Sequence, residues 1–171
     1  MVGRKVIALG ATLLLLASCG AMATLVPIGT GDSQADLYVE FADGANYTFE
    51  VSFNGPMSGM GLFDAVEAAT DLTTVRVFDA AFIDGVTYDG HSNIGFGGGE
   101  NWWHYWIKEP GGDWTMSFIS ATDRVVVDGT ADAWIYGRDS APVPEPATAL
   151  SALMAAGLAF IRTRRGMVTT R

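Results

Sequence analysis

The sequence predicts a small single α+β domain, with one helix packed on a mixed β-sheet, between two hydrophobic ends. Residues 37–41 and 47–53 alternate apolar and polar side chains, as half-buried strands do. Residues 62–69 carry apolar side chains at helical spacing. Further alternating segments follow, so strands lie on both sides of one helix along the chain. This order is typical of an α+β domain.

The N-terminal end has the parts of a secretory signal peptide. Two basic residues precede an apolar core at residues 6–17. Small residues then occupy Ala21 and Ala23, the two positions that a signal peptidase reads. We therefore expect cleavage after Ala23, which would remove residues 1–23.

The same segment allows one alternative. Residues 16–19 also resemble a lipobox, which would place a lipid on Cys19. We favour its removal, because a lipid would add a second membrane anchor to a chain whose tail already supplies one. Cys19 is the only cysteine, so an intrachain disulfide is excluded. Without it the domain has no thiol for catalysis or for a zinc site.

The central region, residues 24–139, is long enough for one domain with its own core. A glycine-containing turn of hairpin length joins the strands at 37–41 and 47–53. The helix is expected to end near Thr70. Later strands are predicted at 75–77, 82–86, 102–107, 114–118, 125–127 and 134–136.

Glycine-rich and Asp-Gly segments are predicted to be loops and turns. Residues 87–101 are expected to form a loop, and tight turns are expected at Asp84-Gly85 and Asp128-Gly129. Both Asp-Gly segments faintly resemble calcium loops. Neither supplies alternating oxygen ligands and a closing bidentate carboxylate, so we interpret both as turns.

The densest aromatic segment reads Trp-Trp-His-Tyr-Trp and is predicted to be a strand. Strand geometry places Trp102, His104 and Trp106 on one face. Trp103 and Tyr105 lie on the other face. One face should pack against the helix, and the other would offer a platform for a sugar ring or a partner surface. Trp103 and Tyr105 are the expected exposed contacts; the alternative is a strand buried on both faces.

No enzyme, metal or cofactor signature is present. His91 and His104 are the only histidines, and no spacing joins them to carboxylates as metal ligands. The sequence contains no Gly-x-Ser-x-Gly elbow, no His-Glu-x-x-His and no phosphate loop. We therefore expect a protein without catalytic activity, metal or cofactor.

The predicted domain is strongly acidic. Of the 19 acidic residues 18 lie in residues 24–139, with only four of the ten basic residues. The resulting charge is about −14, which repels nucleic acid and anionic lipid headgroups. Neither is expected as a partner, and the charge suits a soluble exported domain.

Residues 140–171 have the features of a C-terminal membrane signal. They contain Pro144, Glu145 and Pro146, then an apolar run at 147–161, then Arg162, Arg164 and Arg165. Because proline lacks a backbone N–H and restricts the residue before it, the triplet is expected to be an extended spacer. The arginines should hold the end of the hydrophobic helix on the cytoplasmic side.

In order and spacing this tail resembles the sorting signal of the PEP-CTERM class of bacterial exported proteins. The resemblance implies a Gram-negative-type bacterium in which a membrane-embedded exosortase processes the tail. The protein would then lie transiently in the inner membrane through the tail helix and afterwards reach the cell surface or extracellular matrix. Exopolysaccharide is an associated partner of such systems. The alternative is a permanent anchor, but the apolar run is shorter than the roughly twenty residues that a spanning helix needs.

A second resemblance concerns the central domain. Its segments are GLFDAV at 61–66, IDGV at 83–86, WWHYW at 102–106 and residues 128–136. In this order they resemble the C-terminal β domain of transcobalamin, a family whose members mostly lack an assigned function. The order of elements also fits a β-grasp-like arrangement.

Three functions remain open. The working hypothesis is a surface or matrix module that binds glycan or protein. One alternative is a corrinoid-type ligand-binding domain, although the chain lacks the helical barrel that holds the other side of the corrinoid in cobalamin carriers. The other is a carbohydrate hydrolase with paired carboxylates that no motif singles out.

Overall fold

The computed structural model describes residues 24–98 and 100–142. The predicted signal peptide and sorting signal lie outside the described residues, and so do Cys19, Ala21, Ala23, Pro144, Glu145, Pro146, Arg162, Arg164 and Arg165. Within the described ranges, no helix has the length and apolar character needed to cross a membrane.

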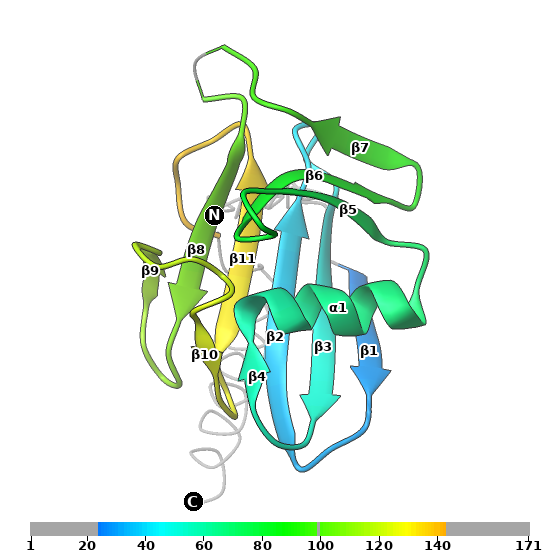
Figure 1. Cartoon of the computed structure of the whole chain (residues 1–171), viewed down its shortest axis with the longest axis vertical. Coiled ribbons are helices and arrows are strands. Elements are labelled where there is room, and N and C mark those ends of the chain that lie inside the picture. The colour runs from blue at the N-terminus through cyan, green and yellow to red at the C-terminus, as the bar shows by residue number, and fades with distance from the viewer. Residues whose placement is uncertain (1–23, 99, 143–171) are drawn as a thin grey trace, which may run out of the picture.

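The described chain is an α+β domain with a single helix, as the sequence predicts (Figure 1). Its elements are β1 (Thr24–Gly29), β2 (Ser33–Glu40), β3 (Asn46–Phe53), β4 (Met57–Ser58), α1 (Gly59–Ala69), β5 (Thr73–Val77), β6 (Phe82–Tyr88), β7 (His91–Ile94), β8 (Trp103–Lys108), β9 (Trp114–Met116), β10 (Val125–Val126) and β11 (Ala131–Tyr136).

The main sheet is mixed and has six strands in the order β1-β3-β2-β11-β8-β9. β2 and β3 form an antiparallel hairpin, and β11 runs parallel to β2 and antiparallel to β8. β1 pairs in parallel with β3 at one edge. A three-stranded sheet, β5-β6-β7, and a short pairing of β10 with β4 complete the domain.

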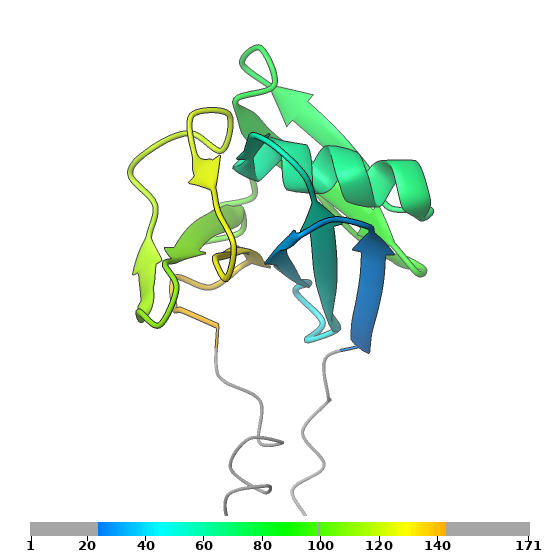
Figure 2. The same ribbon diagram turned by 90° about the horizontal axis from the view of Figure 1, so that it is seen from below.

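A second layer covers one face of the main sheet. α1 crosses β1, β2 and β3, and the β5-β6-β7 sheet lies beside the helix in the same layer (Figures 1 and 2). The start of β1 and the segment that follows β11 both lie on the side of the domain away from α1 (Figure 2). The same layer contains the β5–β6 turn and the loop from β9 to β10.

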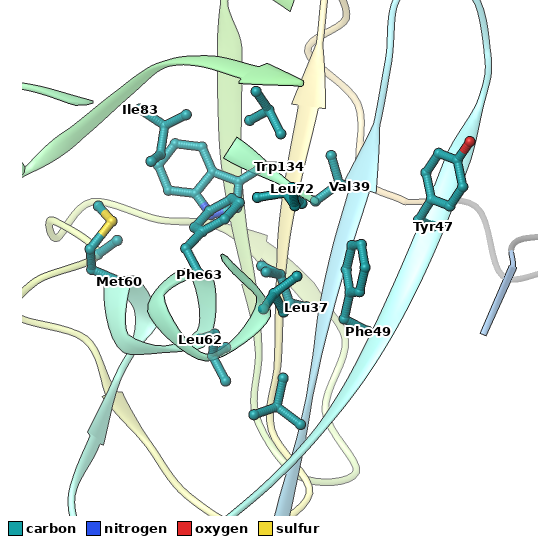
Figure 3. Close-up of a cluster of buried hydrophobic side chains, with 14 of the residues drawn as sticks. Leu37, Val39, Tyr47, Phe49, Met60, Leu62, Phe63, Leu72, Ile83 and Trp134 are labelled. Carbon is teal, nitrogen blue, oxygen red and sulfur yellow. The ribbon is translucent and has the colours of Figure 1, made fainter. Parts of the chain in front are cut away.

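The core fills the space between the two layers. α1 begins at the N-cap Ser58, whose Oγ accepts a hydrogen bond from the Gly61 backbone N–H at 3.0 Å. Its side chains Leu62, Phe63 and Val66 are fully buried. They face the apolar side chains of the central strands, among them Leu37, Val39, Phe49 and Trp134 (Figure 3).

Tyr47 links the hairpin to the three-stranded sheet. Its Oη donates a hydrogen bond to Asp89 Oδ2 at 3.0 Å, and its ring meets the Tyr88 ring edge-on with centroids 4.8 Å apart. Burial, together with the Asp89 carboxylate, raises the pKa of Tyr47 to about 12. The phenol therefore remains a neutral donor well above neutral pH.

The hairpin and the helix confirm the sequence predictions, but the region after β5 differs. Gly85 lies inside β6 and pairs with Ile94 of β7, so the turn expected at Asp84-Gly85 is wrong. A Cβ at Gly85 would lie 2.9 Å from Ile94 Cγ1, which explains the glycine. The turn is instead Asp89-Gly90, where both residues have positive φ, and β7 occupies part of the predicted loop.

Candidate functional site

The aromatic strand is β8, and its core-facing side chains are not the exposed contacts that the sequence predicts. Trp103 is 1% exposed and Tyr105 is 9% exposed. Both belong to the same core cluster as Leu62 and Val66 of α1. The prediction of an exposed platform at Trp103 and Tyr105 is therefore wrong, because their face of β8 is the one that the second layer covers.

The opposite face of β8 is also largely covered. His104 is 2% exposed, while Trp102 and Trp106 are half-buried. His104 Nε2 lies 3.3 Å from the Glu100 carbonyl oxygen. The structure thus agrees with the alternative of a strand buried on both faces.

A pocket of about 140 Å³ lies over β8 and β11. It is bordered by the β5–β6 turn and by the loop from β9 to β10. No Asp, Glu, Lys or Arg side chain lines it. Its lining residues are Ala81, Phe82, Trp102, Trp103, His104, Tyr105, Met116, Ser117, Ile119, Ser120, Ala121 and Trp134.

Stacked aromatic rings form the wall of the pocket. The antiparallel register of β8 and β11 pairs Tyr105 with Trp134. Their rings stack with centroids 4.5 Å apart and an interplanar angle of 15°. Phe82 of β6 stands edge-on to Trp134 and stacks on Phe96 at 5.3 Å. The pocket therefore offers π faces and ring edges to whatever enters it.

Exposed apolar side chains occur in each segment that borders the pocket. Phe118, between the lining residues Ser117 and Ile119, is 96% exposed, and Ile119 is 49% exposed. Phe78, at the β5–β6 turn, is 76% exposed. Phe96, which stacks on the lining residue Phe82, is 60% exposed. Single exposed apolar residues are ordinary, but a group around one pocket is typical of an interaction site.

The β5–β6 turn is conformationally strained. Phe78, Asp79 and Ala80 have φ values of 53°, 55° and 64°, in the left-handed region that disfavours residues with a Cβ. Such backbone strain persists where surrounding structure over-determines it, and it concentrates at functional sites. Here the turn holds Phe78 in solvent beside the pocket.

Few free polar groups face the pocket. Ser117 Oγ donates to the Ile119 carbonyl at 2.8 Å, and Ser120 Oγ bonds Asp123 Oδ2 at 3.0 Å. Among the described residues, Trp134 Nε1 and His104 Nδ1 have no hydrogen-bond partner, although Asp139 Oδ1 lies 3.9 Å from His104 Nδ1. The pocket can therefore hold an apolar group and direct few hydrogen bonds to it.

A buried ionic network lies behind the pocket wall. Asp132 is fully buried and accepts a hydrogen bond from Tyr105 Oη at 2.6 Å. Arg124 Nε lies 3.4 Å from Asp132 Oδ1, and Arg124 Nη1 bonds Glu109 Oε1 at 2.6 Å. A Cβ at Gly59 would lie 2.6 Å from both Asp132 Oδ2 and Tyr105 Oη, so the start of α1 packs directly on this pair.

Burial and pairing act in opposite directions on Asp132. Burial raises the pKa of its carboxyl, and the hydrogen bond from Tyr105 and the nearby Arg124 charge oppose this rise. Burial, and next the Asp132 charge, raise the pKa of Tyr105. The Tyr105 phenol therefore remains a donor, and its ring is fixed in the pocket wall.

This network was not predicted from the sequence. The one signal of it in the sequence is an acidic residue, Asp132, among the uncharged residues of the segment 131–136. Over residues 24–98 and 100–142, no group of three or more His, Cys, Asp or Glu side chains is placed to hold a metal ion.

The fold and pocket together define the class of the protein: an α+β domain with an apolar pocket lined by aromatic side chains. Comparisons with protein-family models, with curated proteins and with solved structures found no match.

Proposed function

We propose that this chain is an exported, non-catalytic binding module that binds a protein partner through the aromatic pocket. The observation that supports this proposal is the pocket itself. It is lined by stacked aromatic rings and flanked by the solvent-exposed side chains of Phe118, Phe78 and Phe96. Aromatic side chains of this kind are enriched where proteins bind one another.

The size and polarity of the pocket favour a protein partner over a glycan. An apolar cavity of about 150 Å³ accommodates one benzene ring, so a pocket of about 140 Å³ suits one apolar side chain. Sugar hydroxyls need several placed donors and acceptors, and the pocket serines are already bonded within the chain. Exopolysaccharide is therefore the second candidate.

The remaining alternatives have less support. A corrinoid is far larger than one side chain, and drug-sized ligands already occupy pockets of roughly 300–1,000 Å³. A glycoside hydrolase needs two carboxyl groups at the scissile bond. No Asp or Glu is among the lining residues.

We also propose a β-grasp-like core within the α+β domain. The support is the local order β3-β2-β11-β8, with β2 and β11 parallel and adjacent and with α1 between the hairpin and the later strands. The likeness to the transcobalamin C-terminal domain remains a proposal that rests on the sequence segments alone.

Export and sorting form a separate part of the proposal. Cleavage after Ala23 by signal peptidase and removal of the tail near Pro144 by an exosortase would deliver the domain to the cell surface or matrix.

Intact-mass analysis of the protein from its producing cells tests the sorting. We expect a mass without residues 1–23 and without the chain beyond the Pro144–Pro146 motif. A lipid on Cys19 would contradict cleavage after Ala23. A mass that retains residues 147–171 would contradict removal of the tail.

Replacement of Phe118 with serine tests the pocket. With a neutral peptide containing one tryptophan between serines as the probe, we expect calorimetry to show at least about tenfold weaker binding, because exposed aromatic anchors dominate interface energy. The free energy of unfolding should change by no more than about 0.5 kcal/mol, since Phe118 is 96% exposed.

The matched control is Leu25→Ser, which removes an exposed apolar side chain from β1 at the distant sheet edge. It should leave binding unchanged. Equal weakening by both variants, or no peptide binding at all, would contradict the proposed site. Binding of the producer's exopolysaccharide that Phe118→Ser abolishes, without peptide binding, would favour the glycan candidate.

A further inference from the structure

We infer that the pocket binds a cationic peptide segment, in which one bulky apolar side chain is flanked by lysine or arginine. The inference rests on the proposed function and adds the chemical class of the partner. It follows from how the few basic residues of the domain are used and from where the acidic ones lie.

Each described arginine already has an acidic partner within the chain. Arg76 pairs with Asp64 and Glu67, in both cases at 2.7 Å. The two other described arginines are paired as well: Arg124 bonds Glu109 at 2.6 Å, and Arg138 bonds Glu40 at 2.6 Å. The described basic side chains therefore offer little positive charge to an incoming ligand.

Lys108 is the one described lysine, and it is also engaged. Its Nζ lies over the Trp114 ring, 5.9 Å from the ring centroid. Lys108 ends β8, whereas the pocket residue Trp103 begins that strand and Trp102 directly precedes it. Lys108 therefore lies at the other end of β8 from those residues.

Exposed carboxylates adjoin the pocket in several of its bordering segments. Asp79 lies in the strained turn, two residues before the lining residue Ala81. Glu100 precedes Trp102, and its backbone carbonyl receives the Trp102 N–H. Asp123 bonds the lining residue Ser120.

The site thus combines an uncharged aromatic interior with an acidic rim. An apolar side chain loses little free energy when it leaves water for the interior of the pocket. Acidic residues that flank it on the same peptide would be repelled by the carboxylates at the rim. A cationic flank would meet opposite charge at the rim. Because rim pairs are solvent-exposed, each adds little, and their sum should change affinity by about tenfold at low salt.

Four matched peptides test the inference on the exported protein purified from its producing cells. Three have a central tryptophan flanked by lysine, serine or glutamate, and the fourth has a central glycine flanked by lysine. We expect the lysine–tryptophan peptide to bind about tenfold more tightly than the serine–tryptophan peptide at 50 mM salt. The advantage should vanish near 1 M salt, where the Debye length is about 3 Å.

Rim variants locate the charges. Asp79→Asn combined with Glu100→Gln should remove most of the advantage of the lysine flank and leave binding of the serine-flanked peptide unchanged. Asparagine suits position 79 because it tolerates positive φ better than most residues. The matched control is Asp113→Asn in the β8–β9 connection, which should leave the advantage intact.

Each other outcome has a definite meaning. Equal affinity for the three tryptophan peptides would overturn the cationic partner and leave the proposed pocket standing. If the lysine–glycine peptide bound as tightly as the lysine–tryptophan peptide, the inferred partner would be overturned as well, since the binding would then be attraction to the acidic surface alone. Failure of every tryptophan peptide would overturn the proposed function itself. Tighter binding of a peptide with the sequence of residues 158–171 would assign the pocket to the chain's own apolar and arginine-rich end and would overturn a separate partner.

Discussion

Replacing Arg124 with methionine is expected to lower the free energy of unfolding by about 3–5 kcal/mol. Asp132 is fully buried, and Arg124 is its only described cationic neighbour. Methionine keeps much of the apolar volume of the arginine stem but leaves a buried carboxylate whose charge is uncompensated. Urea denaturation followed by tryptophan fluorescence measures the loss.

Two comparisons separate the buried charge from lost packing. The double variant Arg124→Met with Asp132→Asn should recover part of the lost stability, because no unpaired charge remains. Arg76→Met removes partly exposed ion pairs with Asp64 and Glu67 and should cost no more than about 1 kcal/mol. An Arg124→Met protein as stable as the parent would contradict the role of the network.

The Arg124→Met defect should also depend on pH. Burial raises the folded-state pKa of Asp132 above the ordinary value of an aspartate, and removal of Arg124 should raise it further. A raised carboxyl pKa favours folding while the group is protonated, and this contribution is lost as pH rises through the folded value. The deficit should therefore be largest at neutral pH and smaller near pH ~4. A deficit that grows on acidification would contradict this assignment.

Replacing Phe63 with alanine is expected to destabilise the domain by about 3–5 kcal/mol. Phe63 projects from α1 into the layer interface, is fully buried, and stands edge-on to Trp134 with centroids 5.8 Å apart (Figure 3). Alanine is a good helix former, so the loss would come from the cavity and the lost contacts. Chemical denaturation with a two-state fit gives the value.

The control for Phe63 lies on the exposed side of the same helix. Ala68→Ser changes an exposed position and should shift stability by no more than about 0.5 kcal/mol. Phe63→Leu should fall between the two, since it leaves a smaller cavity. Similar stability of the alanine variant and the parent would mean that α1 does not depend on this contact.

Local patterns in the sequence predicted the elements with clear periodicity. The β2–β3 hairpin alternates over eight-residue strands, and α1 has apolar residues at helical spacing with a serine N-cap. The two-residue strand β4 was missed, and so were β1 and β7. β1 is a short edge strand that contains Pro27, and β7 has four residues beside a glycine-rich segment. Their strand conformation depends on pairing with β3 and β6, which no local pattern displays.

The site was predicted less well than the fold, for a different reason. Alternation showed that Trp103 and Tyr105 share one face of β8, but the burial of that face depends on the second layer. The pocket is completed by Phe82 and Ile119, which the chain brings together from distant segments. Tyr105 and Asp132 are 27 residues apart in sequence, so their bond follows from the register of β8 and β11.

The start of β1 and the segment after β11 lie on the same side of the domain, and this affects how an attached domain would be oriented. If either end fastened the domain to a support, the face of the main sheet opposite α1 would turn toward that support (Figure 2). The β5–β6 turn and the β9–β10 loop lie in the opposite layer and would point to the surrounding medium. Arriving molecules would then meet Phe78 and Phe118 first, without any rotation of the domain about a hinge.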